Sequence, residues 1–181
     1  MMYLKVPKSR IGVLIGKKGK IKKEVENKSG VVLSIDSEEG DVVIDDSHAD
    51  PLMALKARDF VRAVANGFSP ERAWRIFKED VYFEVIAIKG FVGKRENRIR
   101  VLRGRIIGKN GKTRRIIEEL SGASISVYEY SVAIIGNYNQ VEVAKRAVEM
   151  LLRGSKHATI YHFLEKKRRD MKYSAFEYYH V

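Results

Sequence analysis

The feature that most constrains this chain is an internal repeat built around two glycine loops. The stretch Gly12–Ile21 reads GVLIGKKGKI and the stretch Gly104–Thr113 reads GRIIGKNGKT, so both carry a glycine, an isoleucine before a second glycine, and a third glycine followed by lysine. The two loops lie 92 residues apart, and apolar positions keep that spacing, as Val25 and Ile117 do. Two copies are too few for a solenoid, whose repeats stack on their neighbours. The repeat therefore predicts two tandem domains of the same fold.

Both copies predict the same order of elements, βααββα. A strand rich in β-branched and aromatic residues opens each copy, a short helical turn leads to the glycine loop, and an amphipathic helix follows the loop. Two more strands and a longer helix close the copy. The predicted strands are Met2–Val6, Val31–Asp36 and Asp41–Asp45 in the first copy, and Val81–Ile88, Ala123–Tyr128 and Val132–Gly136 in the second.

Residues that start and end helices support this order. Gly30 and Gly122 follow the helices after the two loops, and a glycine in the left-handed conformation commonly ends a helix. Asp50 and Pro51 start the closing helix of the first copy as its N-cap and first helical residue. In the second copy, apolar residues at helical spacing predict one buried face on the closing helix, formed by Val141, Ala144, Val148 and Leu151.

The positive charge of the chain is concentrated around the two loops. The formal net charge is +12, yet residues 24–88 contain 14 acids and 7 bases. Residues 5–23 contain 8 bases and no acid, and residues 89–115 contain 11 bases and a single acid, Glu96. Like charges that cluster repel one another unless an anion relieves them. The two basic blocks therefore indicate a polyanionic partner rather than charge spread for solubility.

The composition excludes several other classes of protein. The chain has no cysteine, which excludes disulfides and thiolate metal sites, and 45% of its residues are apolar, enough for a folded core. No apolar run approaches the roughly 18 residues of a membrane-spanning helix, and the N-terminus has no apolar segment of signal-peptide length. We therefore expect a cytoplasmic protein with no membrane partner, no metal and no cofactor.

The loops and their surroundings resemble the type I KH domain, a family that binds single-stranded RNA and DNA. Residues Val6–Gly19, VPKSRIGVLIGKKG, carry the Val-Pro start and the Ile-Gly-x-x-Gly signature of that family, and a Ser-Gly pair follows in both copies. The resemblance implies an α+β protein with two tandem type I KH domains, each a three-stranded antiparallel sheet packed on three helices. It divides the chain into a first KH domain with a linker helix (1–79), a second KH domain (80–155), and a C-terminal helix with an aromatic tail (156–181).

One position departs from the family pattern. The residue three after the last glycine of the loop is usually aliphatic, but Lys22 and Arg114 stand there. Ile21, one residue earlier, can take its place in the first copy. The counterpart of Ile21 in the second copy is Thr113, which we expect not to fill this packing position.

The KH resemblance explains why isoleucine lies next to a basic glycine loop. A KH domain clamps the backbone of about four nucleotides with its GXXG loop. Glycines let phosphates approach the main chain, lysines add charge, and the isoleucine before the loop suits the floor of a groove for bases. The predicted RNA-binding residues are Ile15, Gly16, Lys17, Lys18, Gly19 and Lys20 in the first domain, and Arg103, Arg105, Ile107, Gly108, Lys109, Asn110, Gly111, Lys112, Arg114 and Arg115 in the second.

Three residues beside the loops receive a structural interpretation instead. Gly12 and Gly104 lie inside the helices that precede the loops, where a glycine usually permits close packing. Ile11 is expected to belong to the core. None of the three is predicted to contact RNA.

The arginines predict a division of labour between the domains. Arginine binds phosphate bidentately and stacks on bases, whereas lysine acts more as a point charge. Arginines flank only the second loop. We therefore expect the second domain to supply most of the affinity and sequence preference, and the first domain to anchor phosphates.

A narrower resemblance covers most of the chain and is strongest from Ile86 to about Tyr161. The second loop and the basic stretch before it, Gly90–Arg103, are similar to the second KH domain of the pre-ribosomal RNA factor family called partner of Nob-one, whose archaeal members are compact two-KH proteins. The intact GKKG of the first domain is of the archaeal type. The resemblance implies binding of single-stranded RNA near the 3′ end of small-subunit rRNA during ribosome maturation. It also implies the Nob-one endonuclease and the pre-small ribosomal subunit as partners.

Two alternative functions stay open at this point. The chain can be a general RNA-binding module in RNA decay or translational control, or a metal-dependent nuclease with Asp45, Asp46, His48 and Asp50 as ligands. These four residues lie between a predicted strand and a capped helix, where turn residues and an N-cap are expected. We therefore predict a protein that is not an enzyme.

Two segments outside the repeated units are also predicted to be helical. Ser69–Lys78 forms a linker helix whose Ala73, Trp74 and Phe77 share one face. Thr159–Met171 forms a C-terminal helix. The aromatic end Tyr173–Tyr179 is expected to be docked or disordered, with stacking on bases, protein binding and folding back all open.

Overall fold

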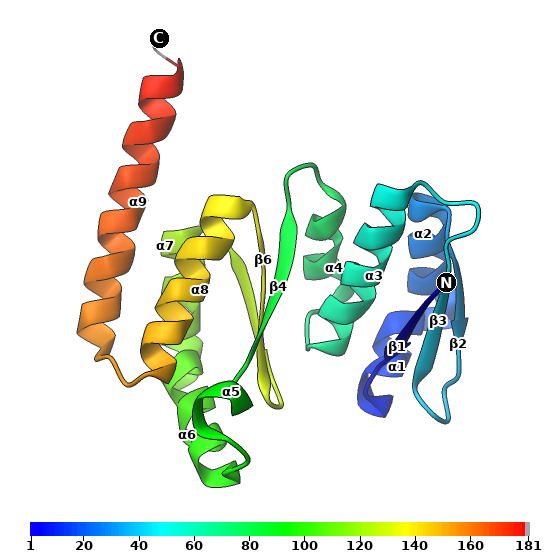
Figure 1. The fold of residues 1–181 in the computed structure, drawn as a ribbon, viewed down its shortest axis with the longest axis horizontal. Coiled ribbons are helices and arrows are strands. Elements are labelled where there is room, and N and C mark those ends of the chain that lie inside the picture. Colours follow the sequence, from blue (N-terminus) through cyan, green and yellow to red (C-terminus); the bar gives the residue numbers. More distant parts are fainter. Residues whose placement is uncertain (180–181) are drawn as a thin grey trace. The chain divides into compact units, whose positions relative to one another are not determined.

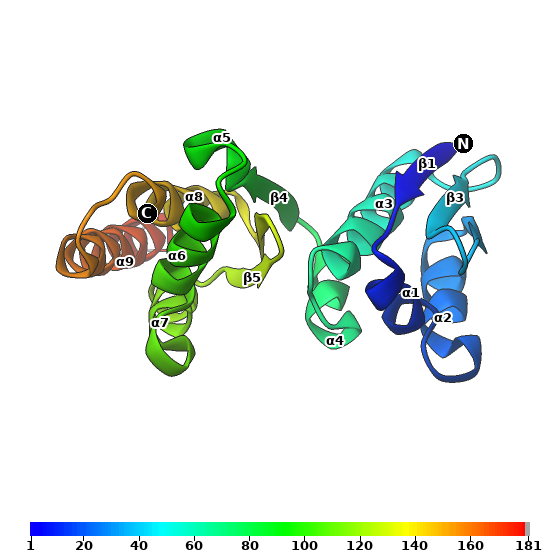
Figure 2. The same cartoon turned by 90° about the horizontal axis from the view of Figure 1, so that it is seen from below.

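The computed structural model describes residues 1–179 and divides into two compact units, with the boundary after Phe83, within strand β4 (Tyr82–Ala87). Figures 1 and 2 show two views of the ribbon. The first unit consists of β1 (Met2–Lys5), α1 (Lys8–Ile15), the 3-10 turn η1 (Lys17–Gly19), α2 (Lys20–Ser29), β2 (Val32–Ile35), β3 (Asp41–Asp45), α3 (Pro51–Ala65), α4 (Pro70–Ala73) and the 3-10 turn η2 (Trp74–Phe77).

The second unit repeats the same order with two additions. It consists of β4 (Tyr82–Ala87), α5 (Lys89–Val92), α6 (Glu96–Ile107), the 3-10 turn η3 (Lys109–Gly111), α7 (Lys112–Ser121), β5 (Ser124–Tyr128), β6 (Ser131–Gly136), α8 (Tyr138–Leu152) and α9 (His157–Tyr179). The short helix α5 has no counterpart in the first unit, and the long helix α9 follows α8 where the first unit has only the short α4 and η2 after α3. The predicted βααββα order is confirmed in both units.

Each unit contains a three-stranded antiparallel sheet whose last strand lies in the middle. The strand orders are β1-β3-β2 and β4-β6-β5. In the first sheet, Ile44 of β3 lies opposite Met2 of β1 and Leu33 of β2. In the second, Ile134 of β6 lies opposite Ile125 of β5. The predicted fold class, an α+β protein with two KH-type sheets and helices, is confirmed.

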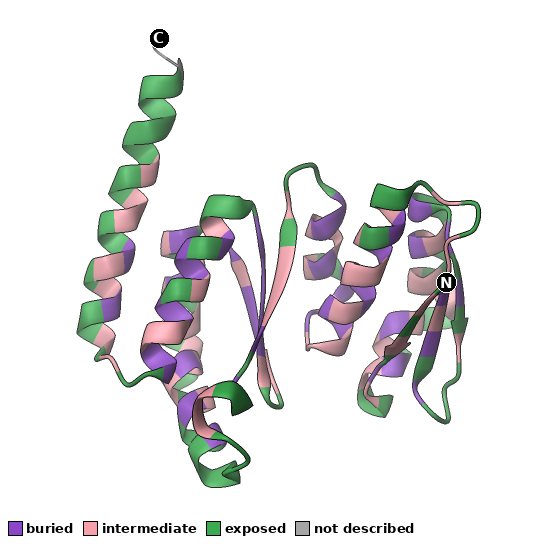
Figure 3. Ribbon diagram, in the orientation of Figure 1, coloured by how far each residue is buried: buried purple, intermediate pink, exposed green. Residues whose placement is uncertain are grey.

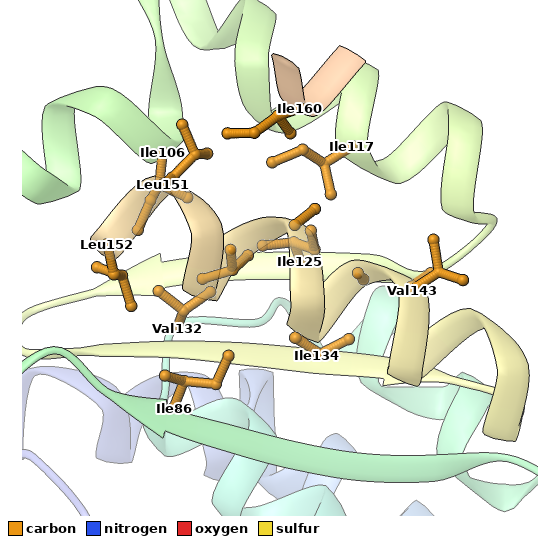
Figure 4. Packing of buried hydrophobic residues seen from close by; sticks show 14 of the residues in the cluster. Ile86, Ile106, Ile117, Ile125, Val132, Ile134, Val143, Leu151, Leu152 and Ile160 are labelled. Atoms are coloured by element: carbon orange, nitrogen blue, oxygen red, sulfur yellow. The ribbon is translucent and has the colours of Figure 1, made fainter. Parts of the chain in front are cut away.

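The helices cover one face of each sheet and bury their apolar side chains there (Figure 3). In the second unit, isoleucines and valines of the sheet meet α6, α7 and α8, and Ile160 of α9 joins the same cluster (Figure 4). The predicted buried face of the closing helix is confirmed, since four residues at helical spacing are buried there: Val141, Ala144, Val148 and Leu151.

The predicted helix ends are also confirmed. The Asp50 side chain accepts hydrogen bonds from the backbone N–H groups of Leu52 and Met53, and Pro51 occupies the first turn of α3. Gly30 and Gly122 end α2 and α7 in the left-handed conformation, at φ 75° and 79°.

The linker residues pack on the first unit. The Trp74 and Phe77 rings lie 4.6 and 5.8 Å from the ring of Phe60 on α3, measured between centroids. Ala73 and Phe77 are buried and Trp74 is partly exposed. The predicted shared face is therefore the face that packs on α3.

The C-terminal helix is longer than predicted. It runs from His157 to Tyr179 without a break at Met171, so a disordered end is wrong for the residues described here. Its first turns pack beside α7 and α8, whereas its last turns are exposed, with Tyr173 at 71% and Phe176 at 61% (Figure 3). The packed first turns provide the helix nucleus, and each residue added beyond them gains one backbone hydrogen bond. His180 and Val181, at the end of the predicted tail, lie outside the described residues.

The expectation for Thr113 is corrected by α9. Thr113 is 3% exposed, and its Oγ1 lies 3.3 Å from the hydroxyl oxygen of Tyr161. A second hydroxyl is what allows this polar side chain to be buried. The family's aliphatic contact is thus replaced by a threonine under an added helix.

Candidate nucleic-acid interface

The two glycine loops have the same backbone conformation. Gly16 and Gly108 begin the loops at φ 72° and 73°, each with ψ near 174°. Gly19 and Gly111 end them in the left-handed region, at φ 75° and 74°. Three of the four residues in each loop therefore have positive φ, since Lys18 and Asn110 have it as well. Such a backbone turns sharply between two helices and leaves loop peptide groups at the surface.

The two glycines of each loop are needed for different reasons. A Cβ on Gly16 would collide with the side chain of Ile21, and one on Gly108 would collide with Thr113. A Cβ on Gly19 would meet no atom within 4 Å. The first glycine therefore lets the loop lie on its own helix, while the second supplies the left-handed turn and leaves the main chain open to a ligand.

The third residues of the two loops differ in how readily they adopt the left-handed conformation of the turn. Lys18 has φ 53° and Asn110 has φ 54°. Asparagine tolerates this region because its short polar side chain bonds locally, whereas for most other residues the left-handed region costs roughly 1–2 kcal/mol. Lys18 therefore carries backbone strain that Asn110 largely avoids.

The loop lysines are exposed and carry uncompensated charge. Among the described residues, Lys17, Lys18, Lys109 and Lys112 take part in none of the ion pairs. Lys20 lies 3.8 Å from Glu24 on the same helix, a contact of little energy at the surface. Free ammonium groups beside exposed peptide groups favour an anion such as a phosphate.

An apolar surface precedes each loop. Ile15 and Ile107 are partly exposed, whereas the neighbouring Leu14 and Ile106 are fully buried. The predicted core position of Ile11 is confirmed at 3% exposure. Each unit thus presents an isoleucine to solvent directly before its cationic loop.

The interpretation of Gly12 and Gly104 is corrected. Both are exposed, and a Cβ at either position would meet nothing within 4 Å. These glycines therefore permit no close packing within the protein. Because these glycines have no side chain, the backbone of α1 and α6 is exposed one turn before the loops, and another molecule can approach it there.

The arginines of the second domain are engaged to different degrees. Arg105 donates hydrogen bonds to the carbonyl oxygens of Leu151 (3.0 Å) and Ser155 (2.6 Å) and so ties α6 to the end of α8. Arg114 pairs with Glu118 on the same helix at 3.1 Å.

Arg115 and Arg103 are less engaged. Arg115 is exposed and donates a hydrogen bond to the Asn110 carbonyl at 3.0 Å, which braces the loop. Arg103 is partly exposed, and its Nε has no hydrogen-bond partner among the described residues.

Sequence reasoning did not single out Arg10, which plays in the first unit the part that Arg105 plays in the second. Its guanidinium donates to the carbonyl oxygen of Val64 (2.8 Å) in the last turn of α3 and to that of Phe68 (2.6 Å) just after the helix. The two arginines are not at equivalent positions of the repeat, so sequence alignment of the copies could not reveal the shared role.

A hollow lies between the first loop and the linker residues. It has a volume of about 480 Å³ and is lined by Gly16, Lys17 and Ile21 of the loop region and by Pro70 and Trp74 of the linker. Trp74 therefore both packs on the core and borders the loop.

The acidic segment after β3 has local structural roles. Ser47 donates hydrogen bonds to Asp45, Asp46 pairs with the N-terminal ammonium at 2.7 Å, and Asp50 caps α3. The bonds from Ser47 lower the pKa of the Asp45 carboxyl, and the ammonium lowers the pKa of Asp46. No group of three or more potential ligand side chains in residues 1–179 could hold a metal ion.

Within the same residues no helix is long and apolar enough to cross a membrane.

Comparison with known families supports both halves of the repeat. A family model described as a KH domain matches residues 1–49, and one described as a eukaryotic type KH-domain (KH-domain type I) matches residues 82–169.

Related proteins match over most or part of the chain. A KH domain-containing protein of Methanocaldococcus jannaschii is 51% identical over 176 residues, which cover 96% of this chain and 77% of that protein. The pre-rRNA-processing protein pno1 of Schizosaccharomyces pombe is 32% identical over 113 residues, 62% of this chain and 47% of that protein. This chain therefore spans about half the length of that eukaryotic relative.

Two solved structures from Pyrococcus horikoshii have the same fold. Dim2p superposes with a TM-score of 0.83 at 51% identity, covering 91% of this chain and 98% of that one. A second structure is a complex of a/eIF2alpha, aDim2p and rRNA. Its matched chain has a TM-score of 0.86 at 50% identity, and the match covers 93% of this chain and 94% of that one.

Proposed function

This chain belongs to the family of KH-domain proteins that includes archaeal Dim2p and eukaryotic PNO1, and from that premise we propose that it binds single-stranded RNA through its two GXXG loops. The observation that carries the proposal is the pair of loops with one backbone conformation and exposed, unpaired lysines. A basic loop beside a half-exposed isoleucine suits a strand whose backbone is charged and whose bases are apolar.

The proposed contacts divide into three groups. Gly16, Gly19, Gly108 and Gly111 shape the backbone that faces the phosphates, and Lys17, Lys18, Lys20, Lys109, Asn110, Lys112 and Arg115 surround it. Ile15 and Ile107 form the apolar floor beside each loop. Arg103, Arg105 and Arg114 complete the set; for Arg105 we propose a positioning role, because both of its hydrogen bonds hold α6 against the end of α8.

The RNA that we propose is the 3′ region of small-subunit rRNA or its precursor, bound during maturation of the subunit. A relative at 50% identity was solved in a complex with rRNA, and eukaryotic relatives are named pre-rRNA-processing proteins. As partners we propose the pre-small ribosomal subunit and the Nob-one endonuclease. The a/eIF2alpha of the P. horikoshii complex is a further candidate. We place this function in the cytoplasm.

We propose binding without catalysis. The acidic segment that could have formed a nuclease site has each carboxylate engaged in a turn, a cap or a terminal ion pair. Cleavage of the RNA then belongs to a separate endonuclease, and this protein presents the strand.

The test is a comparison of single-stranded and duplex RNA of the same sequence. We expect fluorescence anisotropy to give much tighter binding of the single strand, and a steep loss of affinity as salt rises, because lysine contacts to phosphates release counterions. Equal affinity for the duplex would contradict the proposal. RNA cleavage that requires a divalent ion and disappears on changing Asp45 and Asp46 to Ala would contradict the absence of catalysis.

A further inference from the structure

The strand β1 forms an open edge of the first sheet. Within the part of the chain that the structure describes, β1 pairs only with β3. Its outer edge therefore presents backbone N–H and C=O groups that can accept a further strand. Proteins commonly protect such an edge with charged side chains. The only charged residue of β1 is Lys5, and it is paired with Asp41 of the neighbouring strand.

An apolar surface continues from this edge onto α3. Leu52 and Leu55 lie three residues apart, on one face of the helix, and are 58% and 45% exposed. Beside them is a hollow of about 270 Å³, lined by Met2, Asp46, Ala49, Pro51, Ala54 and Leu55. We call Met2, Leu52, Leu55 and this hollow the β1–α3 seam. Large apolar side chains that gather at the surface in this way mark a binding site more often than single ones do.

The corresponding edge of the second sheet carries an ion pair. Val6 and Ile88 each donate a backbone hydrogen bond to the carbonyl group directly before the last strand of their sheet, which aligns β1 with β4. Four residues earlier, Glu84 then occupies the place of Met2. The Glu84 carboxylate pairs with Lys145 on α8. The second edge is thus protected by charge, whereas the first is not.

The helix beside that second edge is also polar where α3 is apolar. The helices α3 and α8 can be aligned by their N-caps, and their buried positions agree in this alignment. Asn139 and Glu142 then occupy the places of Leu52 and Leu55, and both are exposed. The two leucines are therefore not required by the repeated fold at these positions.

The charges around the seam are acidic. Asp45, Asp46 and Asp50 lie between β3 and α3, and of these three only Asp46 has a cationic partner among the described residues, the N-terminal ammonium. Lys56, the first base of α3, donates hydrogen bonds to three carbonyl oxygens of the segment after α4. These acids disfavour a phosphate backbone and favour a lysine or arginine of another protein.

From this arrangement we infer that the edge of β1 and the β1–α3 seam dock an extended segment of a protein partner. The segment pairs with β1 as a fourth strand of the first sheet, and its alternate apolar side chains lie on the two leucines and Met2. Lysines or arginines that flank the segment face Asp45 and Asp50. A second copy of this chain fits less well, because its own seam would bring the same acids to the contact. The site lies outside both GXXG loops and does not depend on the proposed RNA.

The test uses a short synthetic peptide in which valine alternates with threonine between lysines at both ends. We expect it to shift the NMR signals of the β1 amides in the isotope-labelled full chain and to slow hydrogen exchange of alternate β1 N–H groups. Two control peptides have glutamates in place of the lysines or a proline in place of the central valine. Each should bind about tenfold more weakly, because the first is repelled by the acids and the second lacks a hydrogen-bond donor.

Replacing the leucines should weaken peptide binding without changing the fold. We expect the double variant Leu52→Asn, Leu55→Gln to lose about tenfold or more in peptide affinity, because the apolar contact is lost. Its affinity for single-stranded RNA should be unchanged. Val32→Thr is the matched control, since Val32 is also 58% exposed but lies on β2, the other edge strand of the same sheet. Circular dichroism and thermal melting establish that each variant is folded.

Several outcomes would overturn the inference. The lysine peptide could leave the β1 signals unshifted, the glutamate peptide could bind as tightly, or Val32→Thr could weaken binding as much as the leucine variant. Loss of RNA binding in the leucine variant would identify the seam as an RNA surface. A wild-type dimer in analytical ultracentrifugation that the leucine variant does not form would identify the occupant as a second copy of this chain.

Discussion

The hydroxyl oxygens of Thr113 and Tyr161 lie 3.3 Å apart and join the first turn of α7 to the C-terminal helix α9. Thr113 also lies under Gly108, where a Cβ would collide with it. The GXXG loop of the second domain therefore rests on a residue whose burial depends on α9. Ile160 and Leu164 of the same helix are fully buried in the core, so α9 is a structural part of the second unit (Figure 4).

Removing this hydroxyl contact should weaken the second domain modestly. We expect Tyr161→Phe to lower the free energy of unfolding by about 1 kcal/mol, because the Thr113 hydroxyl then stays buried without its hydrogen-bond partner. Urea denaturation measures this change. Thr113→Val should be non-additive with Tyr161→Phe in a double-mutant cycle. Tyr173→Phe, which removes the same group from an exposed position of α9, should have no effect, and an equal loss there would refute the contact.

The strain at Lys18 should be measurable as a gain in stability. Lys18→Asn places in the first loop the residue type that the second loop has at this position, and we expect a stabilisation of up to about 1 kcal/mol together with weaker RNA binding. Lys17→Asn removes the same charge where φ is negative, so it should weaken binding without stabilising the fold. Chemical denaturation and anisotropy on the two variants separate strain from charge. A gain of stability in both variants would mean that relief of like-charge repulsion, not strain, is responsible.

The two glycines of the first loop should differ in their tolerance of a methyl group. Gly16→Ala forces a collision with Ile21 in addition to a strained φ, so we expect a loss of about 3 kcal/mol or more. Gly19→Ala meets no atom and should lose only the roughly 1–2 kcal/mol of the left-handed conformation. The midpoint of urea unfolding of the first domain checks the order. Equal losses would show that the loop shifts to relieve the contact with Ile21.

The order of elements was predictable because its signals are local. The glycines at 30 and 122, the Asp50 cap and the apolar spacing of α8 each act within a few residues, and the repeat doubled every signal. The site loops were predictable for the same reason: their glycines define a backbone conformation that depends on the loop itself.

The misjudged positions depend on contacts between distant segments. Thr113 is buried by a residue 48 positions later, and Arg105 is tied to carbonyl groups 46 and 50 positions later. Gly104 was expected to permit close packing, as a glycine inside a helix commonly does, but nothing packs against it. A single sequence does not show what lies opposite a helix face, so this difference was not predictable.

Charge reversal of the two loops tests which domain supplies most of the affinity. Three of the four arginines that favoured the second domain make contacts within the fold, to Leu151, Glu118 and Asn110, so the number of arginines alone does not decide which domain binds more tightly. The second loop still has the larger basic block, and Arg115 braces the Asn110 carbonyl. We therefore expect the double variant Lys109→Asp, Asn110→Asp to lose on the order of tenfold or more RNA affinity than the double variant Lys17→Asp, Lys18→Asp. The reason is that the new carboxylates repel the RNA phosphates at the loop that we expect to bind more tightly. Lys166→Asp with Lys167→Asp controls for net charge, because both residues are on α9 and Lys167 lies near Gly122, at the end of α7 opposite the second loop. Circular dichroism checks the fold of all three variants. A larger loss in the first-loop variant would make the first domain the principal site and leave the fold unchanged.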